Sequence, residues 1–253
     1  MAINKTVGIA IPIAESVHPK VFQSILSVVA YSCQHGIKVA DIGVTFREII
    51  DLARNNLAEQ FLKTDSEWIF WMDSDMSFPP DVLEQMFKTA EEKNAKIVSG
   101  VYYQRKNKNL PVLWSRGDEL ISGQTSGEGN VKSDRNKYVG AFMFPHKDKK
   151  EPFKAHAAGF GCILVHRSVF EVMDRPWFKF LQGTCSEDFY FLVNAKELGF
   201  ELWINPIPTL GHLADPVFVT KEDFHRKLDT KEVSIDEVVQ NKIQGEIKNE
   251  SVN

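Results

Sequence analysis

The sequence predicts an α/β domain with a mostly parallel β-sheet that is covered by helices on both faces. Apolar segments of strand length alternate with amphipathic segments of helix length between residues 6 and 103. Residues 68–72 are apolar at every position, which is typical of a strand buried on both faces of a sheet. Residues 105–150 are instead rich in Lys, Gly, Asn, Asp and Ser, which indicates a small insertion of loops and antiparallel strands.

The chain opens with a predicted strand at residues 6–13. Pro12 is expected to break this strand at its carboxyl end, because proline has no N–H to donate to a neighbouring strand. A helix over about residues 19–33 follows, with apolar residues on one face. Gly36 is a natural stop for that helix.

A second predicted strand at residues 37–44 carries Asp41. An amphipathic helix over residues 46–62 comes next, with Arg54 among the polar residues in its middle. Six apolar residues of this helix are expected to face the core: Ile49, Ile50, Leu52, Ala53, Leu57 and Phe61.

Two carboxylates follow the buried strand at residues 68–72. Asp73 and Asp75 are one residue apart, so within a strand they would project to the same face. Two anions at the end of a core strand need positive compensation, and a divalent cation bridging to a phosphate would supply it. The alternative interpretation is a plain acidic turn.

Predicted ligand-binding positions converge at one edge of the sheet. A helix over residues 80–93 and a strand over residues 96–103 continue the alternation of strand and helix. In parallel sheets of this kind, ligands collect at the carboxyl ends of the strands. Pro12, Asp41 and residues 73–75 are all expected at those ends.

The second half of the chain adds further candidates. Gly159 and Gly161 precede a predicted buried strand; they either let the backbone approach a ligand closely or form a tight turn. A later strand is predicted at residues 201–205, and His212 follows it in a short strand or turn. By itself, a lone histidine at such a position is structural or a ligand.

An acidic pair begins the helix predicted from residue 186 to residue 198. Ser186, Glu187 and Asp188 suit the first turn of a helix, where a capping side chain and negative charge are stabilising. Asp188 is alternatively a general base for an acceptor hydroxyl, with Glu187 beside it.

Composition excludes several classes of protein. The formal net charge of −4 argues against general or specific nucleic-acid binding, which usually requires a basic surface. No apolar run reaches membrane-spanning length, so we expect no transmembrane segment. Three scattered cysteines predict reduced thiols and a cytoplasmic location, and none forms a Cys-Xaa-Xaa-Cys zinc motif.

Six short motifs in this order make the chain resemble the nucleotide-sugar-dependent glycosyltransferases of the GT-A fold, close to the family 2-like group. They span roughly residues 7–215 and are Ile9-Ala10-Ile11-Pro12, Ala53-Arg54-Asn55, Met72-Asp73-Ser74-Asp75, Gly159-Phe160-Gly161, Ser186-Glu187-Asp188 and Gly211-His212-Leu213. The resemblance implies a UDP- or GDP-sugar donor and a divalent metal, Mn²⁺ or Mg²⁺.

The resemblance also implies roles for individual residues. Asp75 would bind the metal directly, Asp73 would contact the ribose or the metal through water, and His212 would be a further ligand. Around the nucleotide it implies a set of contacts made by Pro12, Glu15, Asp41, Arg54, Asp73, Gly159 and Gly161. Asp188, beside Glu187, would be the base of an inverting mechanism, although a retaining mechanism stays open.

The predicted activity is the transfer of a single sugar, as by a hexosyltransferase, to the hydroxyl of a glycan, protein, lipid or modified nucleobase. The Gln-Xaa-Xaa-Arg-Trp motif of processive synthases is missing. The alternatives are a nucleotidyltransferase and a non-catalytic nucleotide-sugar-binding module. A nucleotidyltransferase would carry a glycine-rich, basic loop where residues 12–16 stand.

The resemblance predicts one domain at residues 1–220. Its nucleotide-binding half would cover about residues 1–104, and its acceptor half about residues 105–220. Residues 221–253 are charged and thinly apolar, which predicts a tail with a short helix over about residues 235–243.

Overall fold

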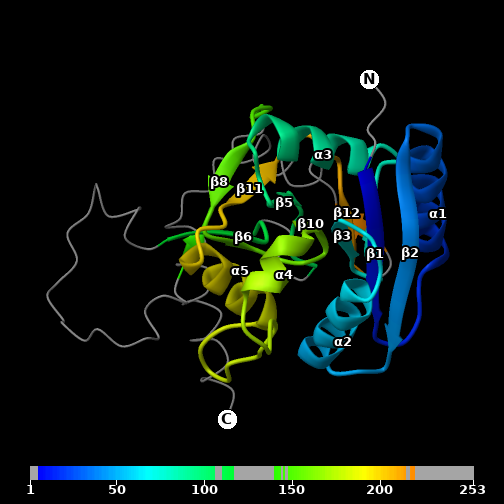
Figure 1. The fold of residues 1–253 in the computed structure, drawn as a ribbon. Helices are drawn as coiled ribbons and strands as arrows, with labels where there is room; N and C mark the ends of the chain where they lie inside the picture. Colours follow the sequence, from blue (N-terminus) through cyan, green and yellow to red (C-terminus); the bar gives the residue numbers. More distant parts are fainter. Residues whose placement is uncertain are drawn as a thin grey trace, which may run out of the picture.

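The computed structural model describes residues 5–105, 110–116, 140–143, 145, 148–214 and 217–219. They form one seven-stranded sheet and two smaller three-stranded sheets (Figure 1). In spatial order, the strands of the large sheet are β2 (Ile37–Phe46), β1 (Lys5–Ile13), β3 (Trp68–Met72), β10 (Cys162–His166), β5 (Ile97–Gly100), β11 (Leu202–Asn205) and β8 (Phe153–Ala155).

The large sheet is mostly parallel, as predicted. β1 pairs in parallel with both β2 and β3, and β5 pairs in parallel with β11. β10 lies antiparallel between β3 and β5, and β8 is antiparallel to β11 at the edge. The predicted α/β fold class is therefore confirmed, with one reversed strand inside the sheet.

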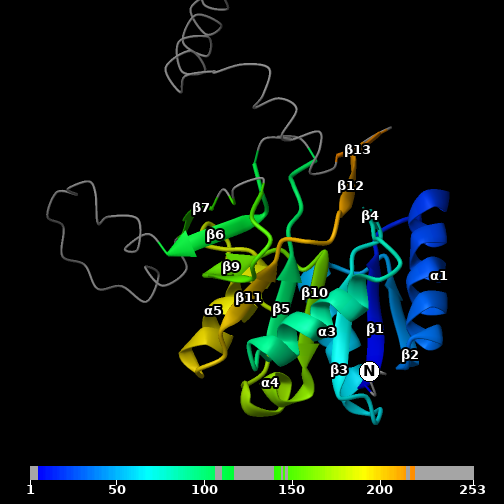
Figure 2. The ribbon, with the colours of Figure 1, turned by 90° about the horizontal axis from the view of Figure 1, so that it is seen from above.

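Helices cover both faces of the large sheet (Figure 2). α1 (Pro19–Gln34) and α3 (Val82–Glu92) pack on one face, and α2 (Ile50–Leu62), α4 (Arg167–Val172) and α5 (Glu187–Glu197) on the other. Side chains of β3 alternate between the two faces of the sheet. Phe70 packs in the apolar cluster on the side of α1 and α3, and Trp71 packs in the cluster on the side of α2, α4 and α5. No helix in the described part of the chain is long and apolar enough to cross a membrane.

The two small sheets extend this framework. One consists of β4 (Met76–Ser77), β12 (Gly211–Ala214) and β13 (Val217–Val219), and the other of β6 (Leu113–Arg116), β7 (Gly140–Phe142) and β9 (Ala157–Ala158). The second sheet is antiparallel, as predicted for this region. The first was not predicted, and it pairs His212 with Met76, directly after the two carboxylates of residues 73–75.

The first strand ends at Ile13, as predicted, and pairs with β2 as far as Phe46. Pro12 lies inside this pairing, opposite Thr45, and the strand continues for one residue beyond it. The proline is tolerated there because β1 has β3 as a second neighbour only as far as Ala10. The strand at residues 96–103 is shorter than predicted, since β5 ends at Gly100.

The start of α2 also differs from the prediction. Phe46 is the last residue of β2, and Arg47 adopts a left-handed conformation (φ 57°) that interrupts the chain before the helix. The helix therefore begins only at Ile50, and it turns Ile49 and Leu52 outward, 74% and 53% exposed, although both were predicted to face the core. The predicted tail at 221–253, with its helix at 235–243, and most of the insertion at 105–150 lie outside the described residues.

Candidate active site

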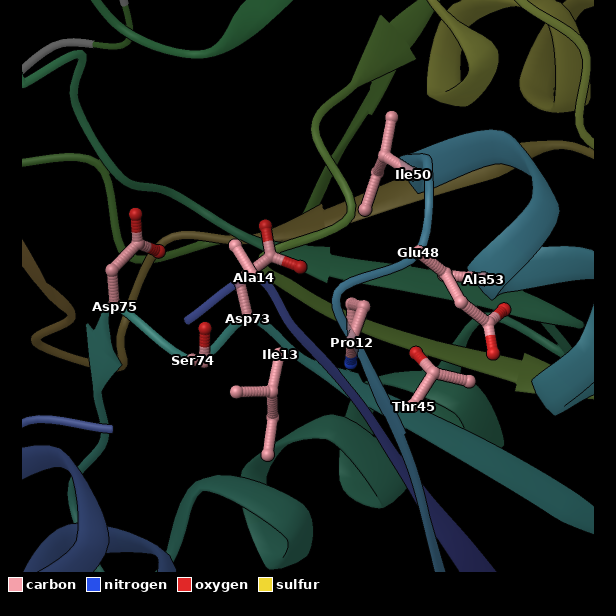
Figure 3. Close-up of a pocket in the computed structure, with 10 residues that line it drawn as sticks. All are labelled: Pro12, Ile13, Ala14, Thr45, Glu48, Ile50, Ala53, Asp73, Ser74 and Asp75. Carbon is pink, nitrogen blue, oxygen red and sulfur yellow. The ribbon is translucent and has the colours of Figure 1, made fainter. Parts of the chain in front are cut away.

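A cavity of about 180 Å³ opens at the carboxyl ends of β1, β2 and β3, beside the start of α2 (Figure 3). β3 ends at Met72, and residues 73–75 turn the chain towards β4, so this turn forms one side of the cavity. The cavity is lined by Pro12, Ile13, Ala14, Thr45, Glu48, Ile50, Ala53, Asp73, Ser74 and Asp75.

The structure brings some of the predicted nucleotide contacts together here and leaves others out. Pro12 and Asp73 line the cavity, as expected for strand ends, whereas Glu15 is exposed and does not. Asp41 was expected at the end of β2, and this is wrong: it is exposed and pairs with Gly8, well before the strand ends. Thr45, paired with Pro12, occupies the corresponding place.

Glu48 is a lining residue that sequence reasoning missed. It lies just before α2 and accepts a hydrogen bond from the side-chain amide of Asn56 at 2.8 Å. Only the late start of α2 places it at the cavity, so a sequence pattern that extends the helix back to residue 46 conceals it.

The two carboxylates of the 73–75 turn face different partners. Asp73 accepts a hydrogen bond from Nη2 of Arg54 at 3.1 Å, while Oδ2 of Asp75 lies 3.0 Å from a guanidinium nitrogen of Arg105. They were expected on one face of a strand, but the strand ends at Met72 and they sit in a turn. Burial raises the pKa of Asp73, and the Arg54 cation does not fully offset this.

His212 faces Asp75 across a gap of 3.4 Å between Nε2 and Oδ2. Its other ring nitrogen, Nδ1, lies 2.7 Å from the carbonyl oxygen of Tyr103. Because a carbonyl only accepts, Nδ1 carries a proton. Nε2 therefore donates to the carboxylate when the ring is doubly protonated, and it offers a lone pair to a cation when the ring is neutral. Burial raises the pKa of Asp75, but His212 and Arg105 outweigh it and hold that pKa below its ordinary value.

Asp75 and the neutral form of His212 would both present lone pairs to a cation placed between them. Carboxylate oxygen is an ordinary ligand of Mn²⁺ and Mg²⁺, and imidazole nitrogen is a ligand of transition-metal ions. Mg²⁺ is often held by one or two protein carboxylates together with substrate phosphates. No group of three or more His, Cys, Asp and Glu side chains in the described ranges is arranged to hold a metal. The three predicted ligands are not gathered around one point: Asp75 and His212 face each other, and Asp73 pairs with Arg54. Their role as metal ligands stays a prediction.

Arg54 is buried, with 3% of its surface exposed. Its Nε donates to Oε1 of Glu187 and its Nη2 to Oδ1 of Asp73, both at 3.1 Å. The two carboxylates raise the pKa of the guanidinium against the effect of burial. The resemblance implied a nucleotide contact for Arg54, but in the structure Arg54 does not line the cavity and instead bonds to Asp73, which does.

Asp188 lies in the first turn of α5, next to Glu187 in the chain. Its Oδ1 accepts hydrogen bonds from the Ser186 hydroxyl and, at 2.7 Å, from the Phe189 N–H. Burial, with the neighbouring Glu187 charge, raises the pKa of Asp188 to about 6. Ser186 is the N-cap residue but makes no side-chain capping bond to the helix, so Asp188 itself satisfies an N–H of the first turn.

The glycines at 159 and 161 make room for Tyr102, a second residue that sequence reasoning missed. The Gly161 N–H donates to the phenol oxygen of Tyr102 at 3.1 Å, and the Gly161 carbonyl accepts from the Asp73 N–H at 3.2 Å. The Tyr102 ring also meets His212 edge to face, with centroids 5.4 Å apart. The glycines thus support the site through Tyr102 and the 73–75 turn.

Replacing Gly159 with Ala should lower the free energy of unfolding by about 1–3 kcal/mol, the usual cost of overpacking. The new Cβ would lie 2.0 Å from the Tyr102 hydroxyl oxygen and 2.7 Å from a methyl of Val112. Gly8→Ala is the matched control, since its Cβ would meet nothing nearer than Phe61 at 3.4 Å. Equal unfolding midpoints in urea for the two variants would contradict the packing role.

Comparisons with known proteins bear on the family and the fold of the chain. Residues 48–173, about half of the chain, match the family model described as Glycosyl transferase family 2. The crystal structure of A197 from STIV is similar in fold, with a TM-score of 0.53 and 15% sequence identity over 85% of this chain and 93% of that chain.

The crystal structure of GalNAc-T7 with UDP, GalNAc and Mn²⁺ gives a TM-score of 0.46 and 12% identity, over 82% of this chain and 44% of that chain. The comparison with curated proteins found no match. On the family match, which covers the buried Arg54, the 73–75 turn and both glycines, the chain belongs to glycosyl transferase family 2.

Proposed function

We propose that this chain transfers a single sugar, in a metal-dependent reaction, from a UDP- or GDP-sugar to an acceptor hydroxyl. The observation that carries the proposal is the pair of potential metal ligands Asp75 and His212, which face each other at 3.4 Å beside the cavity. This arrangement favours a bound divalent cation next to a space at the strand ends where a nucleotide diphosphate is expected.

Asp75 and His212 would hold Mn²⁺ or Mg²⁺, which when bound would neutralise the diphosphate as it leaves. Pro12, Thr45 and Glu48 would surround the nucleoside in the cavity. Asp73 would contact the ribose or a water on the metal side of the cavity. Membership of family 2 supports a nucleotide sugar as donor.

Asp188 would act as the general base. Its carboxylate would take the proton of the acceptor hydroxyl as that oxygen forms a bond to the anomeric carbon and the bond from that carbon to the diphosphate breaks. The displacement would invert the configuration at the anomeric carbon. A hexose as the sugar, and a glycan, protein, lipid or modified nucleobase as the acceptor, complete the proposal.

The raised pKa of Asp188 predicts the pH dependence of the reaction. The base must be ionised to accept a proton, so kcat/KM should be constant well above pH 6 and fall about tenfold per pH unit below it. A pH–rate profile with one donor and fixed Mn²⁺ measures this limb. A limb near pH 4, the ordinary range of an aspartate, would contradict the assignment.

A donor-turnover assay tests the function. The full chain is incubated with UDP- and GDP-sugars, with Mn²⁺ or with EDTA, and the released nucleotide is identified. The proposal predicts release of the nucleoside diphosphate with Mn²⁺ only. Release of pyrophosphate would favour a nucleotidyltransferase, and metal-dependent binding without any release would favour a binding module.

A further inference from the structure

Arg54 joins two parts of the site that lie far apart in the sequence. It belongs to α2, and it bonds to Asp73 at the end of β3 and to Glu187 at the first residue of α5, at 3.1 Å in each case. Arg54 is 3% exposed and Glu187 is 6% exposed. One buried cation therefore connects the wall of the nucleotide cavity to the helix that carries Asp188.

The surroundings of Arg54 make this connection sensitive to charge. The guanidinium carbon lies over the Trp71 and Phe160 rings, 5.6 and 5.3 Å from their centroids. Water is excluded there, so charges interact more strongly than at the surface. One cation serves two carboxylates, and Nη1 of Arg54 is buried without a hydrogen-bond partner among the described residues. A ligand that contacts Asp73 therefore alters how strongly Arg54 holds Glu187.

We propose that Arg54 is a positioning residue that couples nucleotide binding at Asp73 to the placement of Asp188 through Glu187. The inference rests on the proposed function, because it needs a ligand at the 73–75 turn. Glu187 precedes Asp188 in the first turn of α5, so fixing Glu187 fixes the backbone from which the base projects.

The coupling predicts that Glu187 affects nucleotide affinity. This residue does not line the cavity, yet its charge should influence nucleotide affinity through Arg54. With a neutral side chain at position 187, Arg54 would pair with Asp73 alone, and Asp73 would become a weaker partner for a metal-bound nucleotide. The affinity for the nucleotide is therefore expected to fall. If Arg54 only stabilised the fold, removing the charge of Glu187 would change the melting temperature and not the affinity.

The test is a double-mutant cycle measured by isothermal titration of UDP and GDP in the presence of Mn²⁺. Glu187→Gln keeps an acceptor for Arg54 but removes the charge, and Arg54→Lys keeps the charge but cannot bridge both carboxylates. Each single variant should bind the nucleotide about three- to thirtyfold more weakly, the range for residues of one ion-pair network. The double variant should bind no more weakly than the weaker single variant.

Arg167→Lys is the matched control. Arg167 donates to the carbonyl groups of Leu62 and Thr64 at the end of α2, away from the cavity. Its replacement should lower the melting temperature and leave the affinity within twofold of wild type. If Arg54→Lys does not fold, Asp73→Asn replaces it in the cycle and tests the same coupling from the other side.

Three outcomes overturn the inference. Unchanged affinity of Glu187→Gln, or independent effects that multiply in the double variant, would reduce Arg54 to a structural ion pair while leaving the proposed function intact. Wild-type protein that binds neither UDP nor GDP with Mn²⁺ would remove the proposed function together with the coupling. The inference is supported if the losses of affinity in the two single variants do not multiply in the double variant and Arg167→Lys keeps its affinity.

Discussion

Replacing Asp188 with Asn should lower turnover by about a hundred- to ten-thousand-fold, the usual cost of losing a general base. Asparagine keeps the size of the side chain and an oxygen that accepts the Phe189 N–H, but it cannot take a proton. Because the base acts only when the acceptor attacks, the affinity for the donor should stay at the wild-type value. Steady-state kinetics and nucleotide titrations measure the two quantities separately.

The stability of the same variant separates catalysis from helix capping. The fold raises the pKa of Asp188 from 3.8 to about 6, so the folded state binds this proton more tightly than the unfolded chain. Stability therefore falls as the pH rises from about 4 to 6, and the ionised group costs stability at neutral pH. Asp188→Asn should remove this cost and melt no lower than wild type at pH 7. Turnover within about threefold of wild type would contradict the catalytic role.

Replacing Asp75 with Ala should abolish metal-dependent binding of the donor while the fold stays intact. Asp75 lies in a turn, and its side chain is 26% exposed and pairs with Arg105 and His212, so little packing is lost. Its carboxylate supplies one of the two proposed metal ligands from the protein. Titration of Mn²⁺ against a UDP- or GDP-sugar, with circular dichroism as a check of folding, measures the effect.

His212→Ala should have a smaller effect on metal-dependent donor binding than Asp75→Ala. Water can replace a neutral imidazole as a ligand, so the metal dependence should weaken less than it does without the carboxylate. An unchanged Mn²⁺ titration for His212→Ala would return the histidine to a structural role, in which it binds the Tyr103 carbonyl. Metal-dependent donor binding of wild-type strength in Asp75→Ala would contradict the metal site itself.

The sequence predicts the central strand well because β3 depends on local composition. Five apolar residues in a row suit a strand buried on both faces, and β3 covers those five residues. The ends of elements are harder, because they depend on backbone conformations that composition does not specify. The left-handed Arg47 lengthens β2 and delays α2, which moves Asp41 away from the site and brings Glu48 to it.

The structure places several of the predicted site residues near one another, but it gives some of them partners that the sequence did not predict. Asp73, Asp75 and His212 do lie near one another, but the pairing of Arg54 with Glu187 spans 133 positions in the sequence. A polar residue in the middle of an amphipathic helix looks like a surface residue when only its neighbours are known. Tyr102 was missed for the same reason: its partner Gly161 lies 59 positions later, and only the tertiary fold brings them together.

A thermal-shift measurement with nucleotide sugars, with and without Mn²⁺, tests the central claim most directly. A ligand that binds only the folded state raises the melting temperature by mass action. The account predicts that a UDP- or GDP-sugar raises the melting temperature of the wild-type chain with Mn²⁺ present and not with EDTA, and that Asp75→Ala loses this rise. An equal rise with and without metal, or no rise with any nucleotide sugar, would contradict a metal-dependent nucleotide-sugar site at residues 73–75.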